Sequence, residues 1–236
     1  MQLQLAPMGA SYRVAPIDFN QYKAQLISMA SSLAIPFEYQ ALQTSLEKLT
    51  PEILQMRKGE VLLVHGAMRF HTLSDGSVIR SSPRDAALKA IRKLEPRLFL
   101  LGEKHVDHNG PFFLKRFTDA IEYYNAVFES VDHHMPRDSE LRHTFEQNLL
   151  GRDIINVVSC EGLQRISRCE TLDQWRARMK DAGFVNWPLK QGTVTEVRKV
   201  LRKFMTGWDV VEEEGALLLA WRGKPLLATS TWRISS

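Results

Sequence analysis

The alternation of short apolar runs with amphipathic stretches constrains the fold of this chain more than any other feature of its sequence. Runs of strand length occur at residues 3–5, 61–64, 98–101 and 154–159. The stretches between them carry apolar side chains at helical spacing and predict helices over residues 21–33, 83–94 and 110–131. Strands that alternate with helices are typical of an α/β protein with a parallel sheet.

The last third of the chain has a different pattern. Three further apolar runs follow one another at residues 208–211, 216–221 and 226–232, joined by the short segments EEEG and RGKP. Connections of this length link antiparallel strands. Residues 132–151 form the most polar stretch, where we expect a loop followed by a helix. The sequence thus predicts antiparallel strands that close a parallel sheet.

Composition bounds the class of protein. Of the 236 residues, 44% are hydrophobic and 25% are charged, which excludes collagen, low-complexity and disordered chains because such a chain can bury a core. The two cysteines, Cys160 and Cys169, predict free buried thiols in a reducing compartment. The start of the chain lacks a basic segment, and no run approaches the about 20 apolar residues of a membrane span. We therefore expect neither secretion nor a membrane partner.

Motifs for cofactor, metal or nucleophile chemistry are weak. Neither G-x-G-x-x-G nor G-x-x-x-x-G-K-[ST] occurs, and the nearest strand-to-turn candidate, residues 157–162, has one glycine, which a tight turn explains. Histidine and aspartate lie close together at two places: His105, Asp107 and His108, and Asp132, His133 and His134. No cysteine or glutamate pattern completes a metal site there, and no nucleophile elbow is present. We expect structural or surface roles for these histidines, and no cofactor.

Aromatic residues are expected mainly in the core. The tryptophans are large apolar surfaces that pack in cores or interfaces: Trp175, Trp187, Trp208, Trp221 and Trp232. A second set follows helical spacing and is expected to pack a helix on the sheet or on a helical cap: Phe112, Phe113, Phe117, Tyr123, Tyr124 and Phe128.

Basic residues concentrate toward the C-terminus, where residues 151–236 carry 14 basic and 10 acidic side chains within a net charge of +4. The candidates for contact with DNA phosphates or with an acidic partner surface are Arg176, Arg178, Arg198, Lys199, Arg202 and Lys203. Around the last four we expect a helix with its apolar side chains packed inward: Val197, Val200, Leu201 and Phe204. A solvated helix face is the alternative interpretation.

A set of spaced residues is more specific. Three pairs lie near the C-terminus: Arg165 and Glu170 with four residues between them, Trp175 and Gly183 with seven, and Trp221 and Trp232 with ten. Upstream of them stand Pro111-Phe112, Tyr123-Tyr124 and Arg152-Asp153. In this order the residues resemble the PFYRE and SAW blocks of plant GRAS-domain proteins of the SCARECROW-like kind. The similarity extends back through residues 36–39, 59–62 and 82–85, and so covers nearly the whole chain.

The resemblance implies a fold and a domain layout. The fold would be Rossmann-like, with the mostly parallel sheet of a methyltransferase, C-terminal antiparallel strands and a helical cap. The leucine-rich and VHIID blocks of the family are absent, so the chain would be a partial domain, incomplete at its N-terminus. Residues 1–110 would form the middle of the α/β core, residues 111–162 a PFYRE-like block with the cap helices, and residues 163–236 a SAW-like block.

The sequence departs from the family pattern at three places: Arg152-Asp153 in place of Arg-Glu, Ser230-Thr231-Trp232 in place of Ser-Ala-Trp, and His65 where relatives often have Asn. These departures leave the assignment unchanged. From the positions of Arg165 and Glu170 we expect an ion pair between them that fixes the turn before a helix.

The resemblance also implies a function. It predicts a nuclear, non-enzymatic transcriptional regulator in plant development or hormone signalling, which forms homo- or heterodimers with other GRAS proteins and binds other transcription factors or DNA. One alternative is an S-adenosylmethionine-dependent methyltransferase-like enzyme, or a small-molecule binder, whose cofactor loop lies outside the chain. Another is an interfering fragment, because loss of the first strands would expose a sheet edge that aggregates or takes a partner strand.

Overall fold

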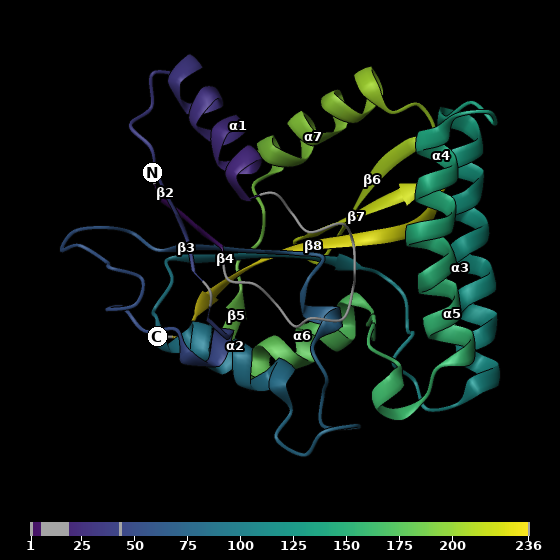
Figure 1. Ribbon diagram of the computed structural model, residues 1–236, viewed down its shortest axis with the longest axis horizontal. Coiled ribbons are helices and arrows are strands. Elements are labelled where there is room, and N and C mark those ends of the chain that lie inside the picture. The colour runs from purple at the N-terminus through teal and green to yellow at the C-terminus, as the bar shows by residue number, and fades with distance from the viewer. Residues whose placement is uncertain (1, 6–18, 43, 236) are drawn as a thin grey trace. The chain divides into compact units, whose positions relative to one another are not determined.

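The computed structural model describes residues 2–5, 19–42 and 44–235 (Figure 1). The chain divides into two compact units, Met1–Glu60 and Val61–Ser236. Every residue that the sequence analysis proposes as a site or motif residue from Pro111 onward belongs to the second unit. None of the described helices is both long enough and apolar enough to cross a membrane.

A parallel strand pair and a helix form the first unit. Strand β1 (Gln2–Leu5) pairs in parallel with β2 (Glu38–Ala41), and helix α1 (Phe19–Ser32) lies between them in the sequence. A short helical turn, η1 (Leu46–Lys48), follows. Parallel strands require a crossover connection, and the chain between β1 and β2, which contains α1, supplies it. The strand predicted at residues 3–5 and the helix predicted at 21–33 are thereby confirmed.

A six-stranded sheet is the centre of the second unit. Its strands are β3 (Leu63–Ala67), β4 (Leu98–Lys104), β5 (Phe184–Asn186), β6 (Trp208–Glu213), β7 (Ala216–Trp221) and β8 (Lys224–Ile234). The order is β3-β4-β8-β7-β6, and β5 also pairs with β8. Only β3 and β4 pair in parallel, while the other neighbours are antiparallel.

The predicted α/β class and the closing antiparallel strands are confirmed, but the sheet of this unit is not mostly parallel. The two hairpins that join β6, β7 and β8 turn at Glu214-Gly215 and Arg222-Gly223, and all four turn residues have positive φ. Connections this short force antiparallel pairing, because a parallel pair needs a crossover of a dozen residues or more.

Helices cover the sheet of the second unit. They are η2 (Phe70–Thr72), α2 (Pro83–Lys93), α3 (Phe113–His134), α4 (Glu140–Phe145), η3 (Glu146–Gly151), α5 (Arg152–Ser159), η4 (Gly162–Gln164), α6 (Leu172–Asp181) and α7 (Gln191–Phe204). Figure 1 shows α2 and α6 on one face of the sheet and α7 on the other, with α3, α4 and α5 gathered at one end. The helices predicted at 83–94 and 110–131 are confirmed, as are the loop and helix within 132–151.

The strand predicted at residues 154–159 is wrong, because this segment is helix α5. The buried residues Asp153, Asn156 and Val157 follow one helical stripe, while Ile155 is exposed. A short apolar run does not by itself distinguish a strand from a buried helix. The weak candidate for a phosphate-binding turn at residues 157–162 therefore follows a helix rather than a strand.

The core confirms most of the aromatic predictions. Trp175, Trp221 and Trp232 are buried, whereas Trp208 is half-buried and Trp187 is exposed. Tyr123 and Tyr124 pack in the cluster between α3, α5 and the C-terminal hairpin. Phe112 and Phe113 do not follow the prediction, since both are exposed at the start of α3. Cys169 is buried as expected, while Cys160 is half-buried, and both are free thiols.

Candidate functional site

A buried carboxylate, Glu170, anchors a network of charged side chains beside α6. Arg178 donates two hydrogen bonds to it, from Nε to Oε2 at 2.5 Å and from Nη2 to Oε1 at 2.6 Å. The Arg84 Nη1 lies 3.1 Å from Oε2, and the Asn109 amide donates to Oε1 at 2.8 Å. Charged groups buried together in this way require mutual compensation, because each unpaired charge would carry a large desolvation cost.

The network extends to two aspartates. Arg178 also donates to Asp75 and Asp85, at 2.7 Å each. Burial alone would raise the pKa of Asp75, but hydrogen bonds from Ser77 and Asn109 and the nearby arginines outweigh it and lower the pKa to about 2. Asp75 is therefore ionised at neutral pH and serves as a fixed counter-charge.

Local sequence places these groups. Helix α6 begins with a capping box: the Thr171 hydroxyl accepts from the Gln174 N–H, and the Gln174 side chain accepts from the Thr171 N–H at 2.7 Å. The cap fixes the start of the helix, so that Trp175 and Arg178 face the interior. After the helix, Gly183 has a φ of +87°, which favours glycine, and a Cβ there would lie 2.7 Å from the Arg92 Nε and displace that side chain.

The expected ion pair between Arg165 and Glu170 is wrong. Arg165 instead donates to the carbonyl oxygens of His108 at 2.9 Å and Gly110 at 3.3 Å, and its Nη2 lies 3.5 Å from Glu161. In an extended segment successive side chains point to opposite sides, so two residues five positions apart, such as these, face away from each other.

A second cluster of arginines lies next to this one. Arg116, Arg165 and Arg168 are buried and meet between the start of α3 and the segment before α6. Arg116 donates to the Val157 carbonyl at 3.0 Å and the Gly110 carbonyl at 2.9 Å, and it pairs with Glu161. Arg168 donates to the Gly162 carbonyl at 2.8 Å. These arginines tie two loops together through backbone oxygens.

The side chains of the neighbours Arg152 and Asp153 have different surroundings. Asp153 is buried and pairs with Lys104 on β4, while Arg152 is exposed. Close enough to this pair to feel both charges, the buried ring of His108 stacks on Tyr124 and meets Tyr123 edge-on. Burial, with repulsion from Lys104, lowers the pKa of His108 to about 3. The imidazole is therefore neutral at physiological pH.

The other histidines take structural positions as well. His105 Nδ1 accepts from the N–H of Leu172, at 3.1 Å, at the start of α6. His133 and His134 end α3 and contact the ring of Trp221. Within the part of the chain that the structure describes, no group of three or more His, Cys, Asp or Glu is arranged to hold a metal ion.

The predicted basic contacts fall into two groups. Arg176 and Arg178 are largely enclosed: Arg176 lies 2.7 Å from Asp173 and 3.4 Å from Glu213, and Arg178 belongs to the Glu170 network. The other four lie on α7, where Lys199, Arg202 and Lys203 are exposed and Arg198 is half-buried.

The apolar side of α7 is narrower than predicted. Val194 and Leu201 are buried and Val197 packs against the same cluster, but Val200 is exposed. The side chain of Phe204 lies outside the described residues. The exposed surface of the helix therefore includes three cations, the aliphatic Val200 and an acid, Glu196, which lies 2.7 Å from Lys199.

A protein-family comparison decides the classification. The model of the GRAS domain family matches residues 3–233. The chain belongs to the GRAS domain family. It is 39% identical over 203 residues to Scarecrow-like protein 14 of Arabidopsis thaliana, a match that covers 86% of this chain and 26% of that protein. It is 34% identical over 209 residues to Scarecrow-like transcription factor PAT1 of Arabidopsis thaliana, covering 89% and 43%.

A solved GRAS structure has the same fold. The crystal structure of SCL7 from Oryza sativa superimposes with a TM-score of 0.87 at 27% identity, covering 98% of this chain and 64% of that one. The chain spans about a quarter to a half of the length of the curated relatives it matches. The α/β fold predicted from the GRAS resemblance is thus confirmed.

The GRAS motif residues lie mainly in the interior. The buried ones are Tyr123, Tyr124, Asp153, Arg165, Glu170, Trp175, Trp221 and Trp232. Pro111, Phe112 and Arg152 are exposed. Most of the motif residues therefore stabilise the fold, and the exposed ones are accessible to other molecules.

Sequence reasoning missed several partners of the motif residues. It did not single out Glu103, which accepts from the backbone N–H groups of Arg69 and Phe70 and lies 2.5 Å from His71 Nδ1. It also missed Arg84, Asp75 and Arg116. A charged residue inside an apolar strand, such as Glu103 in LFLLGEK, was the available signal for a buried pair.

Proposed function

We propose that this GRAS chain takes part in transcriptional regulation in the plant nucleus as a non-enzymatic, SCARECROW-like regulator. The similarity to the Scarecrow-like transcription factor PAT1 supports this proposal. The partners we propose are other GRAS proteins, other transcription factors and DNA. We also propose that the chain is a partial GRAS domain with blocks at residues 1–110, 111–162 and 163–236.

The observation that carries the proposal is the exposed basic face of α7. Lys199, Arg202 and Lys203 project from one region of this helix. Arg198 stands beside them, where it donates to the Val210 carbonyl at 3.0 Å and lies 3.8 Å from Asp209. Cations on a helix surface bind phosphates by releasing condensed counterions, which makes the affinity depend on salt.

Binding of the full chain to labelled duplex DNA by fluorescence anisotropy tests this proposal. The double variant Lys199→Gln/Arg202→Gln removes two charges from α7. We expect its affinity to fall about tenfold, and the slope of log affinity against log salt to become shallower by about 2, because each phosphate contact contributes about one unit.

A matched control lies on α2. Lys89 and Lys93 are exposed basic residues there, so Lys89→Gln/Lys93→Gln makes the same change of net charge. We expect this control to keep more of its affinity than the α7 variant. Equal losses in the two variants would show that α7 has no special role and that net charge alone governs binding.

A further inference from the structure

Two buried arginines, Arg116 and Arg165, share one contacting carboxylate near the start of α3, and a third arginine is buried beside them. Arg116 and Arg165 both pair with Glu161, whose side chain is 61% exposed, whereas their own side chains are 0% and 4% exposed. Arg168 is buried beside them and donates to backbone and amide oxygens. The cluster therefore consists of buried positive charge, and the carboxylate that contacts it belongs to a side chain exposed to solvent.

The hydrogen-bonding capacity of this cluster is incompletely used. Within the described part of the chain, the Arg165 Nε is buried without a hydrogen-bond partner. Burial, together with repulsion from Arg168 and Arg116, lowers the pKa of Arg165 to about 10. The neighbouring acids are engaged elsewhere: Asp107 accepts from the Gly110 N–H and Asp75 binds Arg178. A ligand with more negative charge than one carboxylate would therefore stabilise the cluster.

The backbone adds to this charge. Helix α3 is 22 residues long and begins at Phe113, and the residue at its N-cap, Phe112, supplies no side-chain hydrogen bond to the first turn. The positive end of the helix dipole and its free N–H groups thus lie beside Arg116, which is in the first turn of the same helix.

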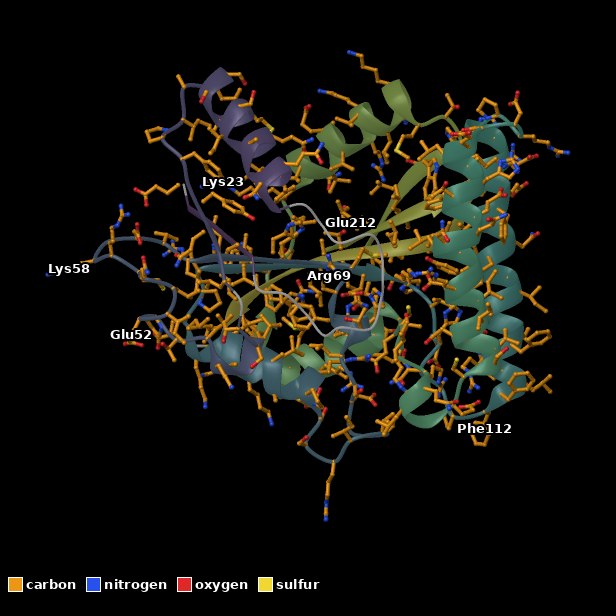
Figure 2. The ribbon with its side chains drawn as sticks, in the orientation of Figure 1. Lys23, Glu52, Lys58, Arg69, Phe112 and Glu212 are labelled. Carbon is orange, nitrogen blue, oxygen red and sulfur yellow. The ribbon has the colours of Figure 1, made fainter. Side chains whose placement is uncertain are left out.

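Exposed apolar side chains occur in the segments that carry the cluster. Phe112, Leu114 and Leu163 are 78%, 74% and 69% exposed. Phe113 is also exposed, and the Arg116 guanidinium lies 5.7 Å from the centre of its ring. Figure 2 shows the side chain of Phe112 projecting outward where α3 begins. Exposed leucine and phenylalanine in the segments that carry a charged cluster suit a protein segment better than a nucleic-acid backbone.

We propose that this region is a docking site for a phosphorylated segment of a partner protein. The phosphate monoester of the segment takes the place of the Glu161 carboxylate against Arg116 and Arg165, and the apolar residues that flank the phosphate contact Phe112, Leu114 and Leu163. A phosphate carries nearly two negative charges and three acceptor oxygens, so it displaces an intramolecular carboxylate that carries one. Glu161 then acts as a gate that excludes weaker anions. The inference is independent of the α7 proposal.

Phenyl phosphate is the probe, because it joins a phosphate monoester to an apolar ring. Its binding to the full 236-residue chain is measured by isothermal titration calorimetry. Glu161→Gln removes the competing charge and keeps the side-chain size, and we expect it to tighten binding about tenfold. Glu122→Gln is the control, since Glu122 is an exposed acid on α3 that pairs with Lys224 at 2.7 Å, and we expect the affinity of the unmodified chain.

A second variant tests whether the planar guanidinium of Arg165 binds the phosphate. Arg165→Lys in the Glu161→Gln background keeps the charge but removes the planar donor set, and we expect it to abolish the gain in affinity while circular dichroism reports an intact fold. Benzoate and inorganic phosphate should bind more weakly than phenyl phosphate, because the first has too little charge and the second lacks the ring.

Several results would overturn the proposal. Equal affinities of Glu161→Gln and Glu122→Gln would show that the carboxylate does not occupy the site. If benzoate bound as tightly as phenyl phosphate, the larger negative charge of the phosphate would not determine binding. Displacement of phenyl phosphate by duplex DNA, but not by a phosphoserine peptide with leucine neighbours, would replace the protein partner with nucleic acid.

Discussion

At the scale of single residues, Glu170 illustrates how the buried charges depend on one another. It neutralises Arg84 and Arg178 within hydrogen-bonding distance, so Glu170→Gln leaves buried positive charge with less compensation. We expect this variant to lower the free energy of unfolding by about 3 kcal/mol, measured by urea denaturation with tryptophan fluorescence. Glu212→Gln, at an exposed position on β6, is the control and should change it by less than about 0.5 kcal/mol. Similar losses at both positions would contradict the role given to the network.

At the scale of elements, the capping box of α6 holds the segment that presents Arg178 to its acids. Thr171→Ala removes the acceptor for the Gln174 N–H, and we expect a loss of about 1 kcal/mol in thermal or urea unfolding. Thr195→Ala is the matched control, because the Thr195 hydroxyl donates to the Gln191 carbonyl within α7, at 3.1 Å, and caps no helix start among the described residues. We expect little change there. If the two threonines cost the same, the cap has no special importance for α6.

At the scale of the whole molecule, His108 couples folding to pH. Its pKa is about 3 in the folded chain against an ordinary 6.5, so the unfolded chain binds the proton first as the pH falls. Neutral His108 therefore costs the fold nothing above pH 6.5. Between pH 6.5 and pH 3 this residue lowers the free energy of unfolding by at most about 1.4 kcal/mol per pH unit. We expect His108→Phe to flatten the decline between pH 6.5 and 4.5 in urea titrations, whereas His143→Gln at an exposed site should not. An unchanged slope in His108→Phe would show that other groups cause the decline.

The order of elements could be predicted because its signals are local. Apolar periodicity and turn residues located α2, α3 and the three C-terminal strands. The same reasoning failed at α5, where a run such as IINVV is compatible with both a strand and a buried helix. Tertiary contacts decide between them, since Val157 packs in the cluster with α3, Asp153 pairs with Lys104 on β4, and Asn156 bonds to Ser167, all from one helical stripe.

The spaced residues of the motif were enough to identify the GRAS family, because residue identity and order are properties of the chain alone. The partners of those residues were not predictable in the same way. Arg178 meets Asp75 across 103 positions and Arg116 meets Glu161 across 45. Which charges meet depends on how the sheet brings distant loops together, and the cost of burying an unpaired charge then allows only compensated arrangements. Tertiary structure therefore settled the ion pairs, the exposed face of α7 and the arginine cluster beneath Glu161.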